Sequence, residues 1–213
     1  MARTIHKVEQ GEHLSSIAAQ YGFSSFIPIW NADENAHIRQ VRDDPHQLLP
    51  GDEIVIPETR PAKFSRKTGA SYSFKVYVEK LKVRLKLLDF MGQPRAGLTA
   101  KVNCGDEPKD ITTDGDGVLE SGMSRDCTAG TLAVDEATYD LAIGALDPVS
   151  EPSGQAARLR NLGYWYGSDD DVLDPDALKL AIQLFQGKNG LPVTGEADAD
   201  FITKLDSVHD GGE

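Results

Sequence analysis

The 213-residue chain has few cysteines, few aromatic side chains and no long apolar run, and these shortages exclude several kinds of protein. Its two cysteines do not form a C-x-x-C pair and have no histidine nearby, so a zinc site is not expected. No apolar run approaches the roughly 20 residues that cross a bilayer. The chain has 22 basic and 34 acidic residues, and the net charge of −12 makes nucleic acid and membrane surfaces poor partners.

The acidity is concentrated in the second and third parts of the chain. Residues 1–82 carry 11 basic and 10 acidic side chains, residues 83–150 carry 6 and 12, and residues 151–213 carry 5 and 12. A hydrophobic content of 39% and a charged content of 26% are ordinary for a globular protein. The length predicts two or three small domains.

The first motif lies at the start of the chain. Residues 6–18 read HKVEQGEHLSSIA, and residues 49–57 read LPGDEIVIP. Gly11 ends a strand, and apolar residues then recur at helical spacing. A second helix is expected to follow, with Pro28 in its first turn. The order strand, helix, helix, strand over residues 1–58 resembles a LysM module, a βααβ unit that binds N-acetylated glycans such as peptidoglycan or chitin.

The LysM resemblance implies a glycan-binding site on two loops. These loops consist of Gly11, Glu12, His13 and Leu14, and of Leu48, Leu49, Pro50 and Gly51. The chain departs from the family in two places. Glu12 and His13 replace the usual Asp-Thr pair, and residues 35–45 are longer than the usual connection.

The middle of the chain has the pattern of an antiparallel β domain. Residues 59–73 are polar, basic and interrupted by Pro and Gly, which predicts a linker. From Phe74 onward apolar residues alternate with polar ones, and turn signals follow at residues 92–97 and 112–120. Residues 74–148 resemble the immunoglobulin-type, carboxypeptidase-regulatory-like modules, which implies a β-sandwich.

Helical signals return after residue 148. Pro175 fits the first position of a helix capped by Asp174, on which Leu178, Ile182 and Phe185 share one face. Three segments recur in a known order, ARLRNLGY, AIQLFQ and GLPVTG. They resemble the three-helix peptidoglycan-binding domain that is often joined to wall hydrolases, here over residues 149–209, followed by a tail at residues 210–213.

Aromatic side chains are candidates for stacking on sugar rings. Trp165 and Tyr166 are expected to face outward and are included in the glycan-binding set, whereas Tyr164 holds the usual core position of the resembled domain. Trp30 lies within a predicted helix, where core packing is favoured over sugar stacking.

The sequence contains no catalytic or metal-binding pattern that stands out. The five histidines lack HxH, HxxD and HExxH spacing, and neither cysteine lies in a motif with a histidine base. Asp114 to Gly117 is explained by hairpin chemistry, and the aspartates at 169–171 by a solvated loop. We therefore predict no enzyme activity, no metal and no cofactor. Cys104 and Cys127 form a disulfide in an oxidising compartment or stay buried thiols in the cytoplasm.

The predicted fold class is multi-domain α+β. The order of the motifs gives three hypotheses for function. The order of modules, with LDPxxxxSGxxARLxNLG at residues 146–163, resembles accessory proteins of type VI secretion and other contractile injection systems. The first hypothesis is a non-catalytic peptidoglycan-binding protein that accompanies a secretion spike or its effector. The second is a protein-docking adaptor or baseplate component without glycan affinity, and the third is a cryptic cell-wall hydrolase. We expect synthesis in the cytoplasm without a signal peptide and delivery to the periplasm or cell wall.

Overall fold

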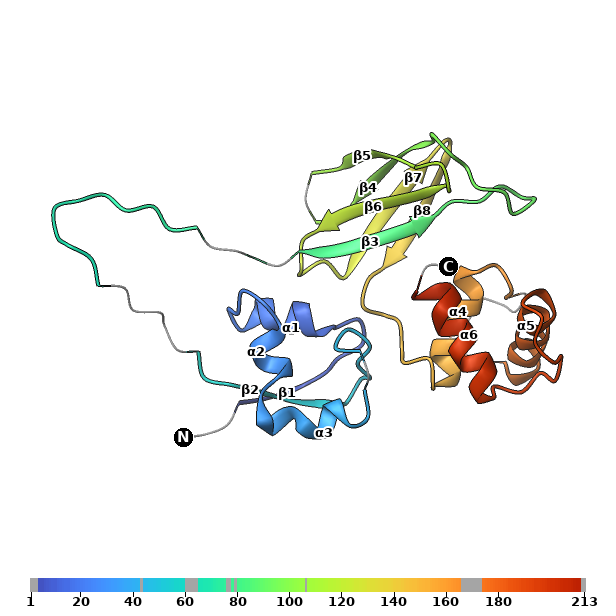
Figure 1. Cartoon of the computed structure of the whole chain (residues 1–213), viewed down its shortest axis with the longest axis horizontal. Helices are drawn as coiled ribbons and strands as arrows, with labels where there is room; N and C mark the ends of the chain where they lie inside the picture. The colour runs from blue at the N-terminus through green and yellow to red at the C-terminus, as the bar shows by residue number, and fades with distance from the viewer. Residues whose placement is uncertain are drawn as a thin grey trace. The chain divides into compact units, whose positions relative to one another are not determined.

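The computed structural model describes residues 4–42, 44–59, 65–75, 78, 80–105, 107–165 and 174–211. It contains helices and antiparallel sheets, which gives an α+β protein (Figure 1). The chain divides into two compact units, residues 1–145 and residues 146–213, and the first contains two separate hydrophobic clusters. Among the described helices, none has the length and apolar character needed to cross a membrane.

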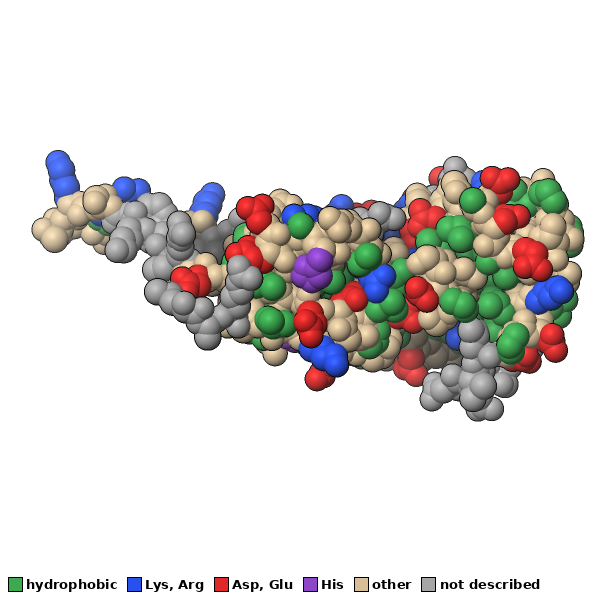
Figure 2. All heavy atoms as spheres, turned by 90° about the horizontal axis from the view of Figure 1, so that it is seen from below, with side chains coloured by type: hydrophobic (Ala, Val, Ile, Leu, Met, Phe, Trp, Pro, Cys, Tyr) green, Lys and Arg blue, Asp and Glu red, His purple; other side chains and the backbone are tan. Residues whose placement is uncertain are grey.

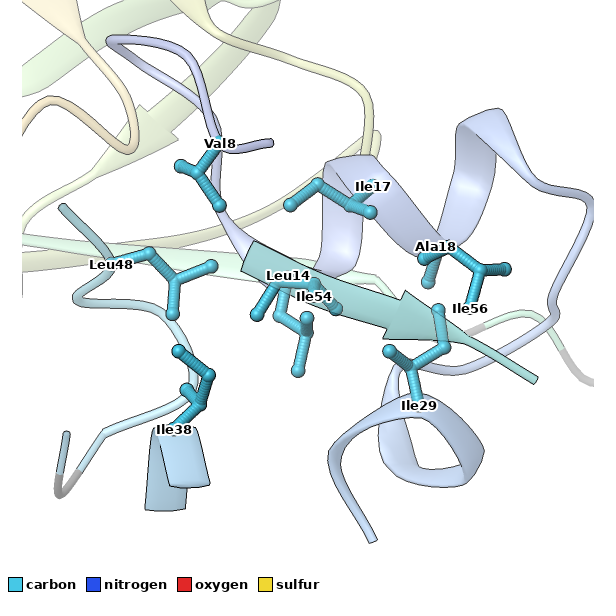
Figure 3. Close-up of a cluster of buried hydrophobic side chains, with 9 residues drawn as sticks. All are labelled: Val8, Leu14, Ile17, Ala18, Ile29, Ile38, Leu48, Ile54 and Ile56. Atoms are coloured by element: carbon cyan, nitrogen blue, oxygen red, sulfur yellow. The ribbon is translucent and has the colours of Figure 1, made fainter. Parts of the chain in front are cut away.

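The N-terminal domain is built on a two-stranded antiparallel sheet. Strands β1 (Thr4–Lys7) and β2 (Glu53–Ile56) pair with Ile5 opposite Val55. The segment between them forms α1 (Leu14–Gln20), α2 (Ile27–Trp30), the 3₁₀ helix η1 (Asp33–Asn35) and α3 (Ala36–Arg39). Nine buried side chains fill the space between the helices and the sheet (Figure 3): Val8, Leu14, Ile17, Ala18, Ile29, Ile38, Leu48, Ile54 and Ile56.

The longer connection predicted at residues 35–45 begins as ordered helical structure. Asn35 is 1% exposed, and its side-chain amide donates to the carbonyl oxygens of Ile29 and Val55, both at 2.8 Å. Its Oδ1 accepts from the amide of Val55 at 2.8 Å. Because the side chain acts as a bridge between α2 and β2, the extra residues extend the domain core rather than forming only a loop.

The middle domain contains two antiparallel sheets that share one hydrophobic cluster. One sheet has the order β3-β6 and the other β5-β4-β7-β8. The strands are β3 (Leu81–Lys86), β4 (Thr99–Asn103), β5 (Lys109–Thr112), β6 (Val118–Met123), β7 (Ala129–Val134) and β8 (Ala137–Ala142). Burial alternates along β3 and β4, as expected for strands that each have one face on a core.

The strand predicted from Phe74 onward begins later than expected. Among the described residues of that segment, Phe74 is 59% exposed and Val78 is 46% exposed, and neither belongs to a strand. The strand β3 begins at Leu81, and β6 supplies a partner for each of its residues. Alternation alone does not form a strand, because a strand also needs a neighbour, here β6, to pair with its backbone groups.

A disulfide and a tight turn secure the middle domain. Cys104 and Cys127 are joined, with Cα atoms 5.9 Å apart, within the usual range for a disulfide. At the turn before β6, Oδ1 of Asp114 accepts from the amides of Asp116 and Val118, both at 2.9 Å. These bonds account for the acidic sequence at this turn.

The described residues of the C-terminal domain form three helices around one core. They are α4 (Pro152–Asn161), α5 (Pro175–Lys188) and α6 (Ala199–His209). As predicted, Asp174 caps α5 through a 3.0 Å bond from the amide of Asp176. Ile182 and Phe185 are buried and Leu178 packs against them. The other buried members of the cluster are Leu159, Ala181, Phe201 and Leu205.

Candidate functional site: the C-terminal domain and the N-terminal loops

A buried arginine joins the two ends of the C-terminal domain. Arg158 on α4 is fully buried, and its Nε and Nη2 donate to Oδ2 of Asp210 at 3.0 and 2.7 Å. Its Nη1 donates to the carbonyl oxygens of Asp147 and Gly154, at 2.8 and 3.0 Å. The guanidinium therefore connects the segment before α4, the helix itself and the residue after α6, as a planar five-donor group can.

The carboxylate partner of this arginine is held in its charged form. Partial burial of Asp210 opposes ionisation. Hydrogen bonds from His209 and Arg158, together with the positive charge of Arg158, nevertheless lower the pKa of Asp210 to about 2. The pair is therefore ionised throughout the neutral range, as a buried arginine requires.

The segment before α4 packs closely against the start of that helix. Oδ2 of Asp147 accepts from the hydroxyl of Ser153 at 2.6 Å. A Cβ on Gly154 would lie 2.1 Å from the carbonyl oxygen of Pro148 and 2.5 Å from that of Asp147, so only glycine fits. The motif LDPxxxxSGxxAR thus has a structural explanation in which the Asp-Pro pair rests on the Ser-Gly turn of the helix.

A buried glutamine fixes the loop between α5 and α6. Gln186 is 1% exposed, and its Oε1 accepts from the amides of Thr194 and Gly195 at 3.0 and 2.9 Å. Its Nε2 donates to Oγ1 of Thr194 and to the carbonyl oxygen of Glu196, both at 3.1 Å. All four hydrogen-bonding positions of the side chain are used. The loop, including the 60% exposed Val193, is therefore presented on a rigid support.

Trp165 is the predicted sugar-stacking residue that the structure describes. It does not face fully outward as expected: its side chain is half-buried and packs against the core of the C-terminal domain. The guanidinium of Arg160 lies 5.1 Å from the ring centroid, within cation–π distance. The indole Nε1 is buried without a hydrogen-bond partner among the described residues. Tyr164, expected in the core, packs edge-on against Phe185 with ring centroids 5.4 Å apart. Tyr166 lies outside the described residues.

The comparison with protein families identifies this domain. Residues 156–205 match the family described as "Putative peptidoglycan binding domain". The match runs from α4 to α6 and includes both Arg158 and Gln186. The C-terminal part of the chain is therefore a peptidoglycan-binding domain, which supports a role in binding the cell wall.

Curated relatives share one short region with the chain. The "Localization factor PodJL" of Caulobacter vibrioides strain NA1000 / CB15N is 45% identical over 47 residues, which is 22% of this chain and 5% of the relative. PodJL of strain ATCC 19089 / CIP 103742 / CB 15 gives the same values. The match thus spans about a twentieth of the length of these relatives. No solved structure matches the chain.

The first predicted glycan loop is largely occupied in supporting the N-terminal domain. Leu14 is fully buried, and His13 is 2% exposed and caps α1, with Nδ1 accepting from the amide of Ser16 at 3.3 Å. Oε2 of Glu12 lies 2.7 Å from Nε2 of His6 and accepts from the amide of Glu9 at 2.8 Å. The structure therefore places Leu14 and His13 inside and leaves Gly11 and Glu12 half-buried at the surface.

The second predicted loop is held by an ion pair that the sequence did not indicate. Leu48 is buried in the core (Figure 3). Pro50 and Gly51 are exposed, and Leu49 is half-buried. Asp52 accepts from the amide of Leu49 at 3.0 Å and from Nε and Nη2 of Arg42 at 2.9 and 3.1 Å. The exposed part of this loop offers backbone groups and small apolar surfaces rather than charged side chains.

The cap at His13 predicts sensitivity to acid. Burial, followed by the neighbouring His46, lowers the pKa of His13 from 6.5 to about 4. The unfolded chain binds the proton near pH 6.5, so stability from neutral His13 is complete above this pH and is lost as pH falls to about 4. We expect a loss of about 2–3 kcal/mol across this window. Protonation of Nδ1 would also remove the acceptor of the cap.

Urea unfolding of the full chain at about pH 7 and about pH 4.5 checks this expectation. A Trp165→Phe background makes Trp30, which packs on the N-terminal core, the fluorescent reporter. His13→Asn keeps a good N-cap without a titrating group. This variant should lose clearly less stability than the parent on acidification, and equal losses would contradict the assignment to His13.

Arg158, Gln186 and Asn35 lie within the motifs and segments singled out in the sequence, but their structural roles were not predicted. Arg158 and Gln186 each occupy a position on the buried stripe of a helix, which is a signal that a polar side chain has a specific buried partner. Asn35 does not lie on an apolar helical stripe in the sequence, so nothing local predicted its burial. No group of three or more His, Cys, Asp or Glu suited to a metal ion occurs in the part of the chain that the structure describes.

Proposed function

We propose that the chain is a non-catalytic protein that attaches to peptidoglycan, with the C-terminal domain as its main binding part and the N-terminal domain as a second, LysM-type part. The observation that carries this proposal is the family match over residues 156–205. Arg158 and Gln186, whose side chains hold the segments around the helices in place, both lie within the matched residues.

Apolar contacts and hydrogen bonds are the interactions proposed for this attachment. Residues 151–213 carry 5 basic and 12 acidic side chains, and the peptides of peptidoglycan also carry carboxylates. On the face shown in Figure 2, acidic and apolar side chains are interspersed. Trp165 packs against the core with Arg160 over its ring, and the part of its side chain that stays exposed is the aromatic surface that we assign to contact with sugar.

The cellular setting that we propose is a contractile injection system. The support is the resemblance of the module order and of the motif at residues 146–163 to accessory proteins of such systems. In this proposal the protein is made in the cytoplasm, accompanies a spike or its effector, and meets the wall during delivery.

A protein-docking adaptor is a second candidate, favoured by the N-terminal loops. His13, Leu14 and Leu48 belong to the predicted glycan set, yet their side chains are buried. If the exposed remainder of these loops binds protein instead of sugar, glycan affinity will be confined to the C-terminal domain or lost. A cryptic hydrolase is the third candidate and differs from both by releasing soluble fragments.

Co-sedimentation of the full chain with insoluble peptidoglycan sacculi tests the proposal. We expect saturable binding without release of soluble muropeptides. Soluble muropeptides should compete for both domains, whereas chitin oligosaccharides should compete only for a LysM-type site. Trp165→Ala should weaken binding about tenfold, the scale of one aromatic contact. Tyr72→Ala is the matched control, because Tyr72 is 42% exposed and lies outside both domains.

Each outcome separates the candidates. Failure of the full chain to sediment, with the fold intact, would overturn peptidoglycan attachment and leave the docking adaptor. Release of muropeptides would establish the hydrolase. Sedimentation that chitin oligosaccharides leave unchanged would confine the glycan site to the C-terminal domain.

A further inference from the structure

The connection between β3 and β4 presents two large apolar side chains to solvent. Phe90 is 97% exposed and Met91 is 71% exposed. This connection projects beyond the ends of the sheets (Figure 1). An isolated exposed apolar residue is ordinary, but an aromatic ring and a thioether side by side on a projecting turn form a candidate contact surface.

The turn that carries these side chains is held in one conformation. Oδ1 of Asp89 accepts from the amides of Met91 and Gln93, both at 2.8 Å. The amide of Gly92 donates to the carbonyl oxygen of Asp89 at 2.9 Å. The amide of Asp89 donates to the carbonyl oxygen of Gln93, also at 2.9 Å. A preformed turn loses little conformational entropy on binding, so contacts made by Phe90 and Met91 are not offset by the cost of ordering a loop.

A hollow lies at the base of the same turn. Its volume is about 200 Å³, and it is lined by Leu87, Leu88, Arg95, Leu132, Val134 and Tyr139. A cavity of roughly 150 Å³ is enough for a benzene ring. The hollow therefore has room for an aromatic side chain and presents a mainly apolar lining to it.

We propose that the turn and the hollow form a surface on which two copies of the chain associate, with Phe90 of each copy in the hollow of the other. A two-fold interface uses the same patch on both partners. Since the turn and the hollow are adjacent, inserting one Phe90 brings the second turn to the second hollow. This association is independent of whether the chain binds glycan.

Two-fold symmetry also brings charged side chains of the two copies together. Asp89 precedes Phe90 on the turn, and Arg95 lines the hollow, where its Nη2 lies 2.7 Å from Oδ2 of Asp135. In the proposed dimer Asp89 of each inserted turn approaches the Arg95 of the other copy, whose guanidinium has five donors and is shared between Asp89 and its own Asp135. An orientation that placed the two turns together would instead bring the two Asp89 carboxylates towards each other.

The size of the surface predicts weak association. A phenylalanine buries about 150–250 Å². Stable interfaces bury roughly 1,200 Å² or more in total. The area buried by two inserted phenylalanines and the residues around them is therefore at or below the lower end of that range. We expect a dissociation constant in the range of about 10–100 µM, so the dimer forms where the protein is locally concentrated.

Sedimentation velocity of the full chain from about 5 to about 500 µM tests the dimer. The wild type should shift from monomer to dimer. Phe90→Ser and Tyr139→Asp should each weaken the dimer at least about tenfold, the effect of losing one anchoring contact. Phe74→Ser should not, because Phe74 is 59% exposed and lies outside this surface. Thermal midpoints confirm folding, which Phe90→Ser should leave unchanged since the side chain makes almost no intramolecular contact.

Mixing the two weakened variants gives a sharper test. A Phe90→Ser copy keeps its hollow and a Tyr139→Asp copy keeps its turn, so a mixed dimer regains one intact contact. We therefore expect more association in the mixture than in either variant alone. A monomer at every concentration, a Phe90→Ser variant that dimerises like the wild type, or no gain on mixing would each overturn the proposal.

Discussion

Replacing Arg158 by alanine is expected to lower the free energy of unfolding of the C-terminal domain by about 3–4 kcal/mol. The substitution leaves the Asp210 carboxylate, 22% exposed at its side chain, without its arginine partner. The carbonyl oxygens of Asp147 and Gly154 also lose a donor. Removing one partner of a buried ion pair typically costs about 3–5 kcal/mol because a buried charge remains. Partial exposure of Asp210 places the expected value in the lower part of that range.

Urea unfolding in a Trp30→Phe background measures this effect, because Trp165 then reports on the C-terminal domain. Arg158→Met separates charge from packing, since it keeps the apolar stem but not the guanidinium. Lys188→Ala on α5 is the exposed-cation control and should change stability by less than about 1 kcal/mol. If Arg158→Ala behaved like Lys188→Ala, the ion pair would not hold the domain together.

An acid titration of the same protein gives an independent check. The pKa of Asp210 is lowered from 3.8 to about 2 in the folded state. The stability that depends on its charge is therefore present above pH 3.8 and is lost as pH falls towards 2. Arg158→Ala should reduce this part of the acid sensitivity, since the arginine is one of the groups that lower the pKa.

Sequence periodicity predicted the helices better than it predicted the chemistry of individual side chains. The cap at Asp174 and the apolar face at Ile182 and Phe185 follow from local spacing and occur as expected. The role of Arg158 depends on Asp210, 52 residues further along, and no local pattern indicates that pairing. The sequence motifs therefore predicted where the domain lies. The interactions that hold it together join residues far apart in the sequence and are seen only in the structure.

The N-terminal loops show a second limit of motif reasoning. The LysM resemblance assigned His13, Leu14 and Leu48 to a glycan site because they fall within the family's loop motifs. In this structure the same residues supply a helix cap and two core side chains. Motif spacing does not separate a residue that supports the fold from one that contacts a ligand. Only exposure does, and it leaves Pro50 and Gly51 as the outermost members of the set.

Reduction of the Cys104–Cys127 disulfide is expected to destabilise the middle domain by about 3 kcal/mol. The bond closes a segment with a sequence separation of 23, and the loop-entropy relation gives about 3 kcal/mol for a loop of this length. Gly130 is fitted to the bond, because a Cβ there would lie 3.1 Å from Sγ of Cys104 and 2.5 Å from the carbonyl oxygen of Asn103. The stability of this domain should therefore depend on the redox state of the compartment that it occupies.

Hydrogen exchange read by mass spectrometry measures this loss without separating the domains. In reductant, amides of β4 and β7 should exchange about a hundredfold faster, the equivalent of about 3 kcal/mol. Peptides from α5 serve as the internal control, since the C-terminal domain contains no cysteine. A Cys104→Ala/Cys127→Ala variant should show the faster exchange with or without reductant. Unchanged exchange of β4 and β7 after complete reduction would show that the shared core of the two sheets stabilises this domain without the bond, and its stability would then be the same in a reducing as in an oxidising compartment.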